Sequence, residues 1–508
     1  MPVSEADLHS PRVDPLALLG KVVQVAEIPQ HRRIFCNRNL RMDEIDLIGF
    51  DMDYTLAIYH QRNIEKLSVD CTLKKLVQNR GYSDELLKLD YDSAFAIRGL
   101  VVDRRNGNIF KMDRYGHVER VYHGRTQLDR EARRQLYHTQ IIRLSTPRYA
   151  WIDTLFALPE AVMFARIVEF LDGRGERVRY TKLWQDIRDS IDEAHRDESM
   201  KRVIKSNLGD YIVRDPELAP TLHKFRSSGK RLFLLTNSAW DYTEKVMSFM
   251  LDGQLSAYPS WRNYFDTIVV SAQKPDFFVE RHPFVELDGE GKEKGAPFGK
   301  ENGAFVRGRI YQGGNVVDFD HLVGGGGDRV LYIGDHIYGD MLRAKKSSVW
   351  RTAMIVQELE QELEVGLRMQ DSIARIEELE RRRVRLDSEL LYQQQVLKSL
   401  GRLEPGEVAR RLAGATVDEA TLEAARDEVR RRLDTLRATL REVSDEVTHL
   451  ERKVDDAFNP YWGPLFKVAV ENSRFGEQVE DYACVYTARV SNFLAYSPLR
   501  YFRSPLLL

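Results

Sequence analysis

Two aspartates lie one residue apart in the run IDLIGFDMDYTLAIY, residues 45–59. A carboxylate can attack phosphorus and form an aspartyl-phosphate that water later hydrolyses, so Asp51 is a candidate nucleophile. Asp53 is expected on the same side of an extended segment, where it can protonate the leaving oxygen and then deprotonate the attacking water. Because two carboxylates would repel a phosphate dianion, the pair predicts phosphoryl chemistry assisted by a divalent cation and fixed positive groups.

Ligands for such a cation and a positive group occur further along the chain. Asp335 and Asp340, in the run GDHIYGD, supply hard oxygen ligands suited to Mg²⁺. Lys274, in a Lys-Pro pair, would offset the negative charge that develops in the transition state.

A third motif, TNS, offers donors for phosphate oxygens. Thr236, Asn237 and Ser238 provide hydroxyl, amide and backbone N–H groups at a point where a helix can begin. Taken singly, each of these motifs is more often a turn or a cap than a catalytic group. Their joint order, DxDxT, TNS, KP and GDxxxxD, favours a catalytic site.

Each motif ends an apolar run that is typical of a buried strand. The runs are IDLIGF (45–50), KRLFLLTNS (230–238), DTIVVSAQKP (266–275) and RVLYIGDHIYGD (329–340). They alternate with helical patterns, as in an α/β domain with a parallel sheet. Ligands of open α/β sheets gather outside the carboxyl ends of the strands, so the four endings are expected to converge on one site.

The segment between the first and second runs is long enough to be an inserted domain. Residues 98–124, RGLVVDRRNGNIFKMDRYGHVERVYHG, predict a meander of short strands with a hairpin turn at Asn106-Gly107. Residues 182–207 predict a helical stretch. We interpret the insertion as a cap over the catalytic face.

Heptad-like spacing of apolar residues marks residues 356–456 as a coiled coil. One helix carries Ile376, Leu379, Leu386, Leu390, Leu397 and Leu400, and the other carries Val429, Leu433, Leu436, Leu440, Val443, Val447, Leu450 and Val454. Arg383 and Gln393 interrupt the first seam, and the Gly- and Pro-containing link GRLEPGEVARRLAGATVDEA allows an antiparallel hairpin. The seam predicts packing or oligomerisation, and the Arg and Glu runs predict solvated faces.

Composition excludes several classes of partner. The 76 basic and 78 acidic residues nearly cancel, which argues against nucleic acid or an anionic membrane as a partner. Cys36, Cys71 and Cys484 have no metal-ligand spacing and fit a reducing compartment. No signal peptide or membrane span is apparent, so a soluble cytoplasmic protein is expected. Gly324 to Gly327 precede a strand and lack a following Gly-Lys-Ser/Thr, which favours a connection over a phosphate loop.

The order of the motifs resembles the haloacid dehalogenase superfamily of aspartyl phosphatases. The resemblance narrows to the cytosolic purine 5'-nucleotidase family, the type that prefers IMP and GMP. It is carried by FDMDYTLAIY, RGLV, LFALPE, LWQDIRDSIDEAH, LTNSAWDYTEKVM, YFDTIVVSAQKPDFF and YIGDHIYGDMLRAKKSSVWRT, and later by WGPLFK. It covers most of residues 30–355 and returns around 460–500.

The resemblance implies a role for each matching residue of the core. Asp51 is the phosphorylated nucleophile, and Asp53 is the acid and base, whose backbone carbonyl also binds Mg²⁺. Asp51 and Asp335 are the carboxylate ligands of the metal, and Asp340 supports them. A separate set holds the phosphate: Thr236, Asn237 and Lys274, with Ser238 beside them.

In the cap, the resemblance assigns recognition of the purine and its ribose to Arg188, Asp192, His195 and Lys201. The first three lie at i, i+4 and i+7, on a stripe beside an apolar helix face. From the residues alone, an ordinary surface ion pair between Arg188 and Asp192 is the competing interpretation. With the resemblance, Arg188 donates to the carbonyl oxygen of a 6-oxopurine and Asp192 accepts from a ring N–H.

The chain departs from the family at two places. Arg125 and Thr126 replace an aromatic residue and an amide that the family places against the base, so base preference is open. The resemblance also implies an activating nucleotide and a homo-oligomer, either a dimer or a tetramer. Residues that match the effector site are Tyr338, Lys346, Gln478 and Tyr482, and the nearby carboxylate of Asp481 would repel an effector phosphate.

The expected fold is α/β, with a Rossmann-like haloacid dehalogenase core and an inserted α+β cap. We expect the core at residues 1–60 and 225–355, the cap at 61–224 and the hairpin at 356–456. The remaining residues, 457–508, are expected to form a helical segment on the core or at an oligomer interface.

Three kinds of protein fit this sequence. The first is a Mg²⁺-dependent purine nucleotidase that can also transfer the phosphoryl group to a nucleoside. The second is a phosphatase with the same chemistry for another small phosphate ester. The third is a coiled-coil interaction protein with a relic catalytic domain, which the complete catalytic set disfavours.

Overall fold

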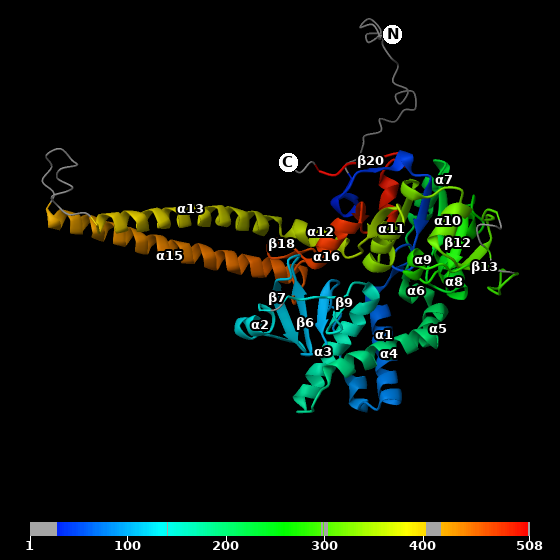
Figure 1. Cartoon of the computed structure of the whole chain (residues 1–508), viewed down its shortest axis with the longest axis horizontal. Helices are drawn as coiled ribbons and strands as arrows, with labels where there is room; N and C mark the ends of the chain where they lie inside the picture. Colours follow the sequence, from blue (N-terminus) through cyan, green and yellow to red (C-terminus); the bar gives the residue numbers. More distant parts are fainter. Residues whose placement is uncertain (1–27, 140, 296–297, 299–302, 403–417, 506–508) are drawn as a thin grey trace, which may run out of the picture.

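A computed structural model describes residues 28–139, 141–295, 298, 303–402 and 418–505 of the chain. Its outline is a body from which a long helical hairpin projects to one side (Figure 1). The cap lies on one side of the body, below the central sheet in this view.

A nine-stranded sheet forms the centre of the body, in the order β1-β19-β16-β15-β3-β11-β12-β14-β13. Pairing is parallel from β19 to β14 and antiparallel at the two edges. The strands in chain order are β1 (Phe35–Cys36), β3 (Leu47–Phe50), β11 (Arg231–Leu235), β12 (Thr267–Val270), β13 (Phe284–Leu287), β14 (Ile310–Gly313), β15 (Val330–Gly334), β16 (Arg351–Ile355) and β19 (Val485–Thr487). The predicted α/β class with a parallel sheet is confirmed.

The four predicted strand runs are neighbours in this sheet. They form β15, β3, β11 and β12, which lie side by side in that order. Alternate side chains of β3 face opposite layers, because Ile48 and Phe50 join one apolar cluster and Leu47 joins another. Gly49 leaves room for the ring of Phe233, since a Cβ there would lie 2.0 Å from its Cζ.

Helices cover both faces of the sheet, as the two clusters require. They are α7 (Leu218–Ser227), α8 (Trp240–Leu251), α9 (Asp276–Val279), α10 (Val316–Leu322) and α11 (Arg343–Ser347). Gly324 to Gly327 form the connection from α10 towards β15, as their place before a strand predicts. Short turns complete the body: the 3-10 turns η3 (Gln30–Arg32), η4 (Met42–Glu44), η7 (Trp261–Tyr264), η9 (Gly327–Arg329) and η11 (Val490–Ala495), and the π-helical turn η10 (Ile337–Leu342).

The cap is an antiparallel sheet backed by helices. Its five strands run in the order β8-β7-β6-β5-β9. They are β5 (Leu100–Asp103), β6 (Asn108–Met112), β7 (Val118–His123), β8 (Thr126–Gln127) and β9 (Tyr149–Ile152). The helices and turns are α1 (Gln61–Arg80), η5 (Asp84–Lys88), α2 (Arg130–Tyr137), η6 (Leu155–Ala157), α3 (Leu158–Gly173), α4 (Tyr180–Arg196), α5 (Ser199–Ser206) and α6 (Leu208–Tyr211).

The helical stretch predicted at residues 182–207 is two helices, not one. The break falls between α4 and α5, where Glu198 has a φ of 61°. The Asp197 carboxylate accepts from the backbone N–H of Ser199 at 3.0 Å, so it satisfies a donor at the start of the second helix. This break turns α5 towards α8 of the core.

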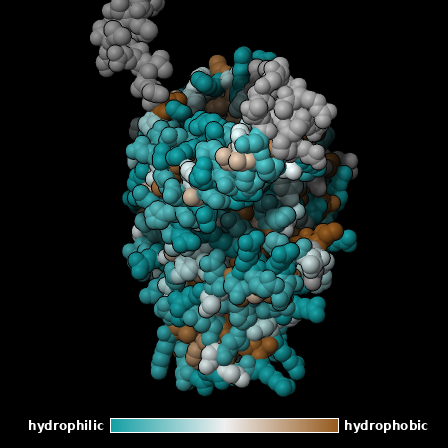
Figure 2. All heavy atoms as spheres, turned by 90° about the vertical axis from the view of Figure 1, so that its left-hand side faces the viewer, coloured by the Kyte–Doolittle hydropathy of each residue, from teal (hydrophilic) through white to brown (hydrophobic). Residues whose placement is uncertain are grey.

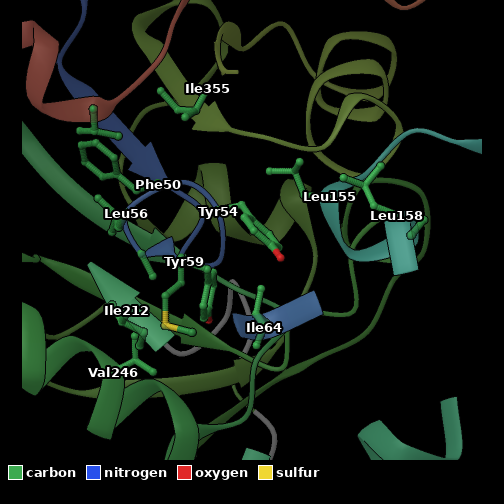
Figure 3. Close-up of a cluster of buried hydrophobic side chains, with 14 of the residues drawn as sticks. Phe50, Tyr54, Leu56, Tyr59, Ile64, Leu155, Leu158, Ile212, Val246 and Ile355 are labelled. Atoms are coloured by element: carbon green, nitrogen blue, oxygen red, sulfur yellow. The ribbon is translucent and has the colours of Figure 1, made fainter. Parts of the chain in front are cut away.

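The chain enters and leaves the cap through two short paired strands. β4 (Ile58–Tyr59) pairs antiparallel with β10 (Ile212–Val213). Figure 3 shows the apolar cluster at this junction, with Phe50 and Val246 from the core, Ile64 and Leu158 from the cap, and Tyr54 and Tyr59 from the connection. The cap and the core domain therefore share one apolar cluster, which lies beside the strand ends.

The hairpin consists of α13 (Gln370–Leu400) and α15 (Glu419–Phe458), joined to the core by α12 (Leu359–Arg368). The two long helices pack side by side (Figure 1). Leu379, Val443 and Val447 are the buried centre of the seam. Arg375 pairs with Glu446 across the seam at 2.9 Å. Figure 2, seen from the side of the hairpin tip, shows a mostly hydrophilic face with small separate hydrophobic spots.

The C-terminal segment combines short strands with the helix α16 and the turn η11. Its elements are β17 (Lys467–Val468), β18 (Glu471–Asn472), α16 (Arg474–Tyr482), β19 and β20 (Tyr501–Phe502), and β20 pairs with β2 (Leu40–Arg41). The run Val485–Thr487 is rich in residues that favour strands, and the open edge of β16 offers unpaired backbone groups. Among the described residues, no helix is both long and apolar enough to cross a membrane.

Candidate active site

Three carboxylates meet where β3 and β15 end. Asp51 follows β3, Asp335 follows β15, and Asp340 lies in η10. One oxygen of each carboxylate lies within 4.8 Å of the others, and all three residues are buried. The convergence arises because β3 and β15 are adjacent and parallel, with the Asp51 N–H donating to the Ile333 carbonyl at 2.9 Å.

Lys274 is the positive group of the site. Its Nζ lies 2.9 Å from Asp51 Oδ1 and 2.7 Å from Asp340 Oδ1, and it donates to the Tyr332 hydroxyl at 2.8 Å. Burial alone would lower the pKa of Lys274, but attraction to Asp340 and Asp51 outweighs burial and raises that pKa. The ammonium therefore stays charged between the two carboxylates.

Lys274 does not fully compensate the negative charge of the three carboxylates, as the pKa shifts of Asp51 and Asp335 indicate. Burial raises the pKa of Asp51 to about 7; Lys274 opposes this rise, while Asp340 and Asp53 add to it. Burial, Asp340 and Asp51 raise the pKa of Asp335 well above its usual value. Asp335 Oδ2 is also buried without a hydrogen-bond partner in the described part of the chain. An orphaned acceptor among crowded carboxylate oxygens fits a hard divalent cation such as Mg²⁺.

The Asp53 side chain stands apart from this cluster. It accepts hydrogen bonds from the Tyr59 hydroxyl and from Ser238 Oγ, the latter at 2.7 Å. Tyr59 in turn lies 2.9 Å from the Tyr242 hydroxyl. Ser238, predicted to bind substrate, thus orients Asp53 in the structure.

The TNS motif ties the ends of β11 and β12 together. The Asn237 amide donates to the Lys274 carbonyl at 2.9 Å, and its oxygen accepts from the Lys274 N–H at 2.6 Å. Thr236 is fully buried, and its hydroxyl accepts from the Ser238 N–H at 3.1 Å. The Asn237 side chain therefore positions the Lys274 loop, a role that the sequence did not predict.

Two adjoining cavities open beside these groups. The first, of about 200 Å³, is lined by Asp51, Asp53, Thr154, Phe156, Asn237, Lys274, Asp335, His336, Gly339 and Asp340. The second, of about 310 Å³, is lined by Asp53, Tyr59, Ile64, Phe156, His195, Met200, Lys201, Ile204, Asn237, Ser238 and Tyr242. They share Asp53, Phe156 and Asn237, so a ligand with a charged end and a planar, less polar end could span both.

Comparison with known proteins places this site in a family. The model of the 5' nucleotidase family matches residues 34–507. The chain belongs to this family. The family predicted from the motifs is therefore confirmed, and with it the expectation of a phosphoric monoester hydrolase.

The similar proteins are named after the same domain. A 5'-nucleotidase domain-containing protein of Dictyostelium discoideum is 29% identical over 483 residues, which are 94% of this chain and 74% of that protein. The 5'-nucleotidase domain-containing protein 2 of Rattus norvegicus and that of Homo sapiens are each 31% identical over 354 residues, or 67% of this chain. The match covers 62% of the rat protein and 66% of the human protein.

Solved structures give weaker matches. An archaeal beta-phosphoglucomutase from Pyrococcus sp. strain ST 04 is 12% identical, with 61% of this chain and 86% of that chain covered and a TM-score of 0.27. CbbY from Rhodobacter sphaeroides is 14% identical over the same shares, with a TM-score of 0.22. The assignment of this family member to the α/β class therefore rests on the order and direction of its own strands.

Of the four cap residues predicted to bind substrate, two line the second cavity of this 5' nucleotidase family member. They are His195 and Lys201. Burial, and then Lys201, lower the pKa of His195, which favours a neutral imidazole. The His195 ring lies edge-on to the Phe156 ring, with 6.4 Å between the ring centres. Lys201 Nζ lies 5.7 Å from the centre of the Tyr242 ring. Both cap residues thus stand close to Asp53.

The other two, Arg188 and Asp192, line neither cavity. Arg188 Nη1 donates to both oxygens of Glu160, at 2.8 and 2.9 Å, and Asp192 is exposed. Burial raises the pKa of Glu160 to about 7, and Arg188 opposes that rise. The surface pair of Arg188 with Asp192, the competing interpretation from the sequence, is thus replaced by a half-buried pair with Glu160.

Arg125 and Thr126 also lie away from the cavities. Arg125 Nε donates to Glu169 at 2.9 Å, and its Nη1 lies 3.5 Å from Asp90. Thr126 begins β8 and is exposed. Neither residue lines either cavity, so these two departures leave base preference open.

The residues matching the effector site lie around the packing of α16 on η10. Tyr338 accepts from Arg343, and Lys345 Nζ lies 5.8 Å from the centre of the Tyr482 ring. Gln478 Oε1 is buried and has no hydrogen-bond partner among the described residues. The side chain of Lys346 lies outside the described residues. The backbone carbonyl of Asp481 accepts from Arg38 and Lys345.

Arg98 is a site residue that the sequence did not single out as functional. It is buried, and its Nη1 donates to the Asp335 carbonyl at 3.1 Å. Its Nε donates to Glu358 at 2.7 Å, and Nη2 donates to the other oxygen of Glu358. A cap arginine thus holds the backbone of one residue of the carboxylate cluster. The signal was the RGLV string, which carried the family resemblance but no chemical interpretation of its own.

Proposed function

We propose that this protein is a Mg²⁺-dependent 5'-nucleotidase that hydrolyses nucleoside monophosphates of the 6-oxopurine type, IMP and GMP, through an aspartyl-phosphate on Asp51. The supporting observation is the buried carboxylate cluster on Lys274, placed directly beside a cavity that cap residues line. The chemistry needs core groups at one end of the ligand and cap groups at the other.

Asp51, Asp335 and the Asp53 carbonyl would hold Mg²⁺, with Asp340 supporting them. When bound, the ion would supply positive charge that offsets the carboxylates and the phosphate dianion. Asp340 already shares Lys274 with Asp51, so its role is to keep the lysine between them.

Hydrolysis follows in two displacements. A carboxylate oxygen of Asp51 attacks phosphorus, a P–O bond to Asp51 forms, and the P–O5' bond breaks. Asp53 gives its proton to the leaving O5' and then takes a proton from the water that attacks the aspartyl-phosphate. A P–O bond to the water oxygen forms as the P–O bond to Asp51 breaks, inorganic phosphate leaves, and both carboxyl groups return to their starting states. A ribose hydroxyl that replaces this water would give phosphotransfer to a nucleoside.

The base would occupy the second cavity, where Phe156, His195 and Tyr242 offer faces and edges to a planar ring. Lys201 would face the ribose or phosphate side. The preference for a 6-oxopurine rests on Arg188 and Asp192. For Arg188 to donate to the base carbonyl, it must exchange the Glu160 carboxylate for the base.

A second candidate is a phosphatase of the same chemistry for another small phosphate ester. It is favoured by one observation, namely that Arg188 and Asp192 line neither cavity. The proposal for the whole protein also includes a cytoplasmic, homo-oligomeric state, either dimer or tetramer. It further includes a nucleotide effector near Tyr338, Gln478 and Tyr482. The three free cysteines fit the reducing compartment.

The test is phosphate release from a panel of nucleoside monophosphates and sugar phosphates with Mg²⁺. Wild type, Asp51→Asn and a control, Asp434→Asn on the exposed face of the hairpin, are compared. We expect IMP and GMP to lead, Asp51→Asn to be inactive and the control to match wild type. Sugar phosphates or pyrimidine nucleotides in the lead would instead support the second candidate.

A further inference from the structure

The segment that follows the hairpin lies between the cap sheet and the core. Lys111, on cap strand β6, sends its side chain into this segment and is 3% exposed. Its Nζ donates to the carbonyl oxygens of Trp462 at 3.0 Å and Lys467 at 2.7 Å, and to that of Pro464. Three backbone carbonyls thus match the three donors of one ammonium group.

Further cap groups hold the same segment. Arg120 Nη1 and the Tyr122 hydroxyl donate to the Tyr461 carbonyl, at 3.0 and 3.2 Å. The Trp462 indole donates to the Phe95 carbonyl, and its ring lies 4.7 Å from that of Tyr122. The cap side of this contact is therefore both hydrogen-bonded and packed.

The core holds the segment from the other side. Glu362, on α12 directly after core strand β16, accepts from the Leu465 N–H at 3.0 and 3.1 Å. Further along, α16 packs on η10, the turn that carries Asp340. One short stretch of chain therefore connects the cap sheet to α12, which follows β16, and to η10, which follows β15.

This connection adds to the other contacts that hold the cap on the core, namely the shared apolar cluster and the bonds of Arg98. The chain itself crosses between core and cap at the β4–β10 pair, where it enters and leaves the cap. Rotation of the cap about that pair would break the three buried hydrogen bonds of Lys111, so these bonds help to fix the orientation of the cap sheet. Burial lowers the pKa of Lys111 to about 8, and Glu362 opposes that shift.

We propose that Lys111 is a positioning residue that sets the cap over the core carboxylates, so that hydrolysis of a nucleotide depends on it and hydrolysis of a small aryl phosphate does not. A nucleotide must meet Asp51 in the core and His195 in the cap at once. An aryl phosphate needs only the core groups. This inference rests on the proposed function.

The experiment compares Lys111→Met with wild type on the best monophosphate of the panel and on p-nitrophenyl phosphate. The control, Lys66→Met, removes an exposed lysine of cap helix α1. We expect Lys111→Met to lose tenfold or more in kcat/KM for the nucleotide, mainly through a raised KM. Its p-nitrophenyl phosphate activity should stay within twofold of wild type, as should both activities of the control.

A second variant keeps Lys111 and removes neighbouring bonds, in case Lys111→Met does not fold. Arg120→Gln with Tyr122→Phe should show a smaller loss of the same selective kind. Equal losses on both substrates, or no loss on either, in the variants that fold would overturn the proposal.

Hydrogen exchange separates this inference from the proposed function. Lys111→Met, or the double variant in its place, should speed amide exchange in residues 461–467 and in β5 to β7, while the core strands stay protected. A wild-type protein that cleaves p-nitrophenyl phosphate but no nucleotide would refute the proposed substrate. In that case, unchanged exchange at the cap would refute the positioning role.

Discussion

Lys274 is the residue on which the charge balance of the site depends. It lies between Asp51 and Asp340, and burial leaves little water to screen any of the three charges. Without it, the carboxylates would repel each other and an incoming phosphate. The sequence predicted a positive group here, and the structure adds its two carboxylate partners.

Lys274→Met is therefore expected to lower kcat for p-nitrophenyl phosphate by about 10²–10³-fold, the range for removing one preorganised charge from a transition state. Steady-state phosphate release measures this. The control is Lys292→Met, an exposed lysine paired only with Glu290 among the described residues. If Lys274→Met kept activity within threefold of wild type, the ammonium would have a structural role only and no catalytic one.

The hairpin is the element most independent of the site. Leu379, Val443 and Val447 form the buried centre of its seam. The hairpin projects away from the body of the molecule (Figure 1). The hairpin contacts the cap near the C-terminal end of α15, where Asp455 and the residues that follow α15 bond to Arg120. Damage to the middle of the seam should thus separate hairpin stability from catalysis.

Leu379→Ala tests this separation. Loss of a buried leucine should cost about 2–5 kcal/mol of hairpin stability, seen as earlier loss of helical circular dichroism and faster proteolysis. Leu391→Ala, the same change at a side chain that is 65% exposed on the same helix, should change neither. Turnover of p-nitrophenyl phosphate should stay unchanged in both, and a fall in Leu379→Ala alone would mean that the seam supports the site.

At the scale of the whole molecule, the crowded carboxylates make folding and metal binding interdependent. Asp51, Asp335 and Asp340 are buried together; Lys274 pairs with Asp51 and Asp340, and Arg98 and His336 oppose the raised pKa of Asp335. A divalent cation that binds only the folded state should stabilise it by an amount that rises with the logarithm of the cation concentration above Kd.

Mg²⁺ is accordingly expected to raise the melting temperature of wild type, with about 2.7 kcal/mol of stabilisation at a hundredfold excess over Kd. Chelation should abolish hydrolysis, and added Mg²⁺ should restore it. Asp335→Asn should lose the thermal shift, whereas Asp328→Asn, which changes a carboxylate outside the cluster, should keep it. An equal shift in all three proteins would place the ion elsewhere.

Residues close together in sequence were the easiest to predict. The spacing of Asp51 and Asp53, the strand runs that precede each motif, and the heptad seam all depend on local periodicity, which is visible without contacts. The convergence of distant strand ends also followed, because parallel strands of one sheet share a carboxyl edge. The sequence by itself thus determined the α/β class, the family and the meeting of the motif residues at one edge of the sheet.

Only the tertiary structure decided which side chains meet. It paired Arg188 with Glu160, directed Ser238 to Asp53, joined Asn237 to the Lys274 loop and placed Arg98 behind Asp335. It also inserted β19 into the central sheet and seated Lys111 on the segment after the hairpin. The side-chain contacts among these join residues 28 to 356 positions apart in the chain. No local pattern encodes such partners, because they depend on how the cap and the core pack in three dimensions.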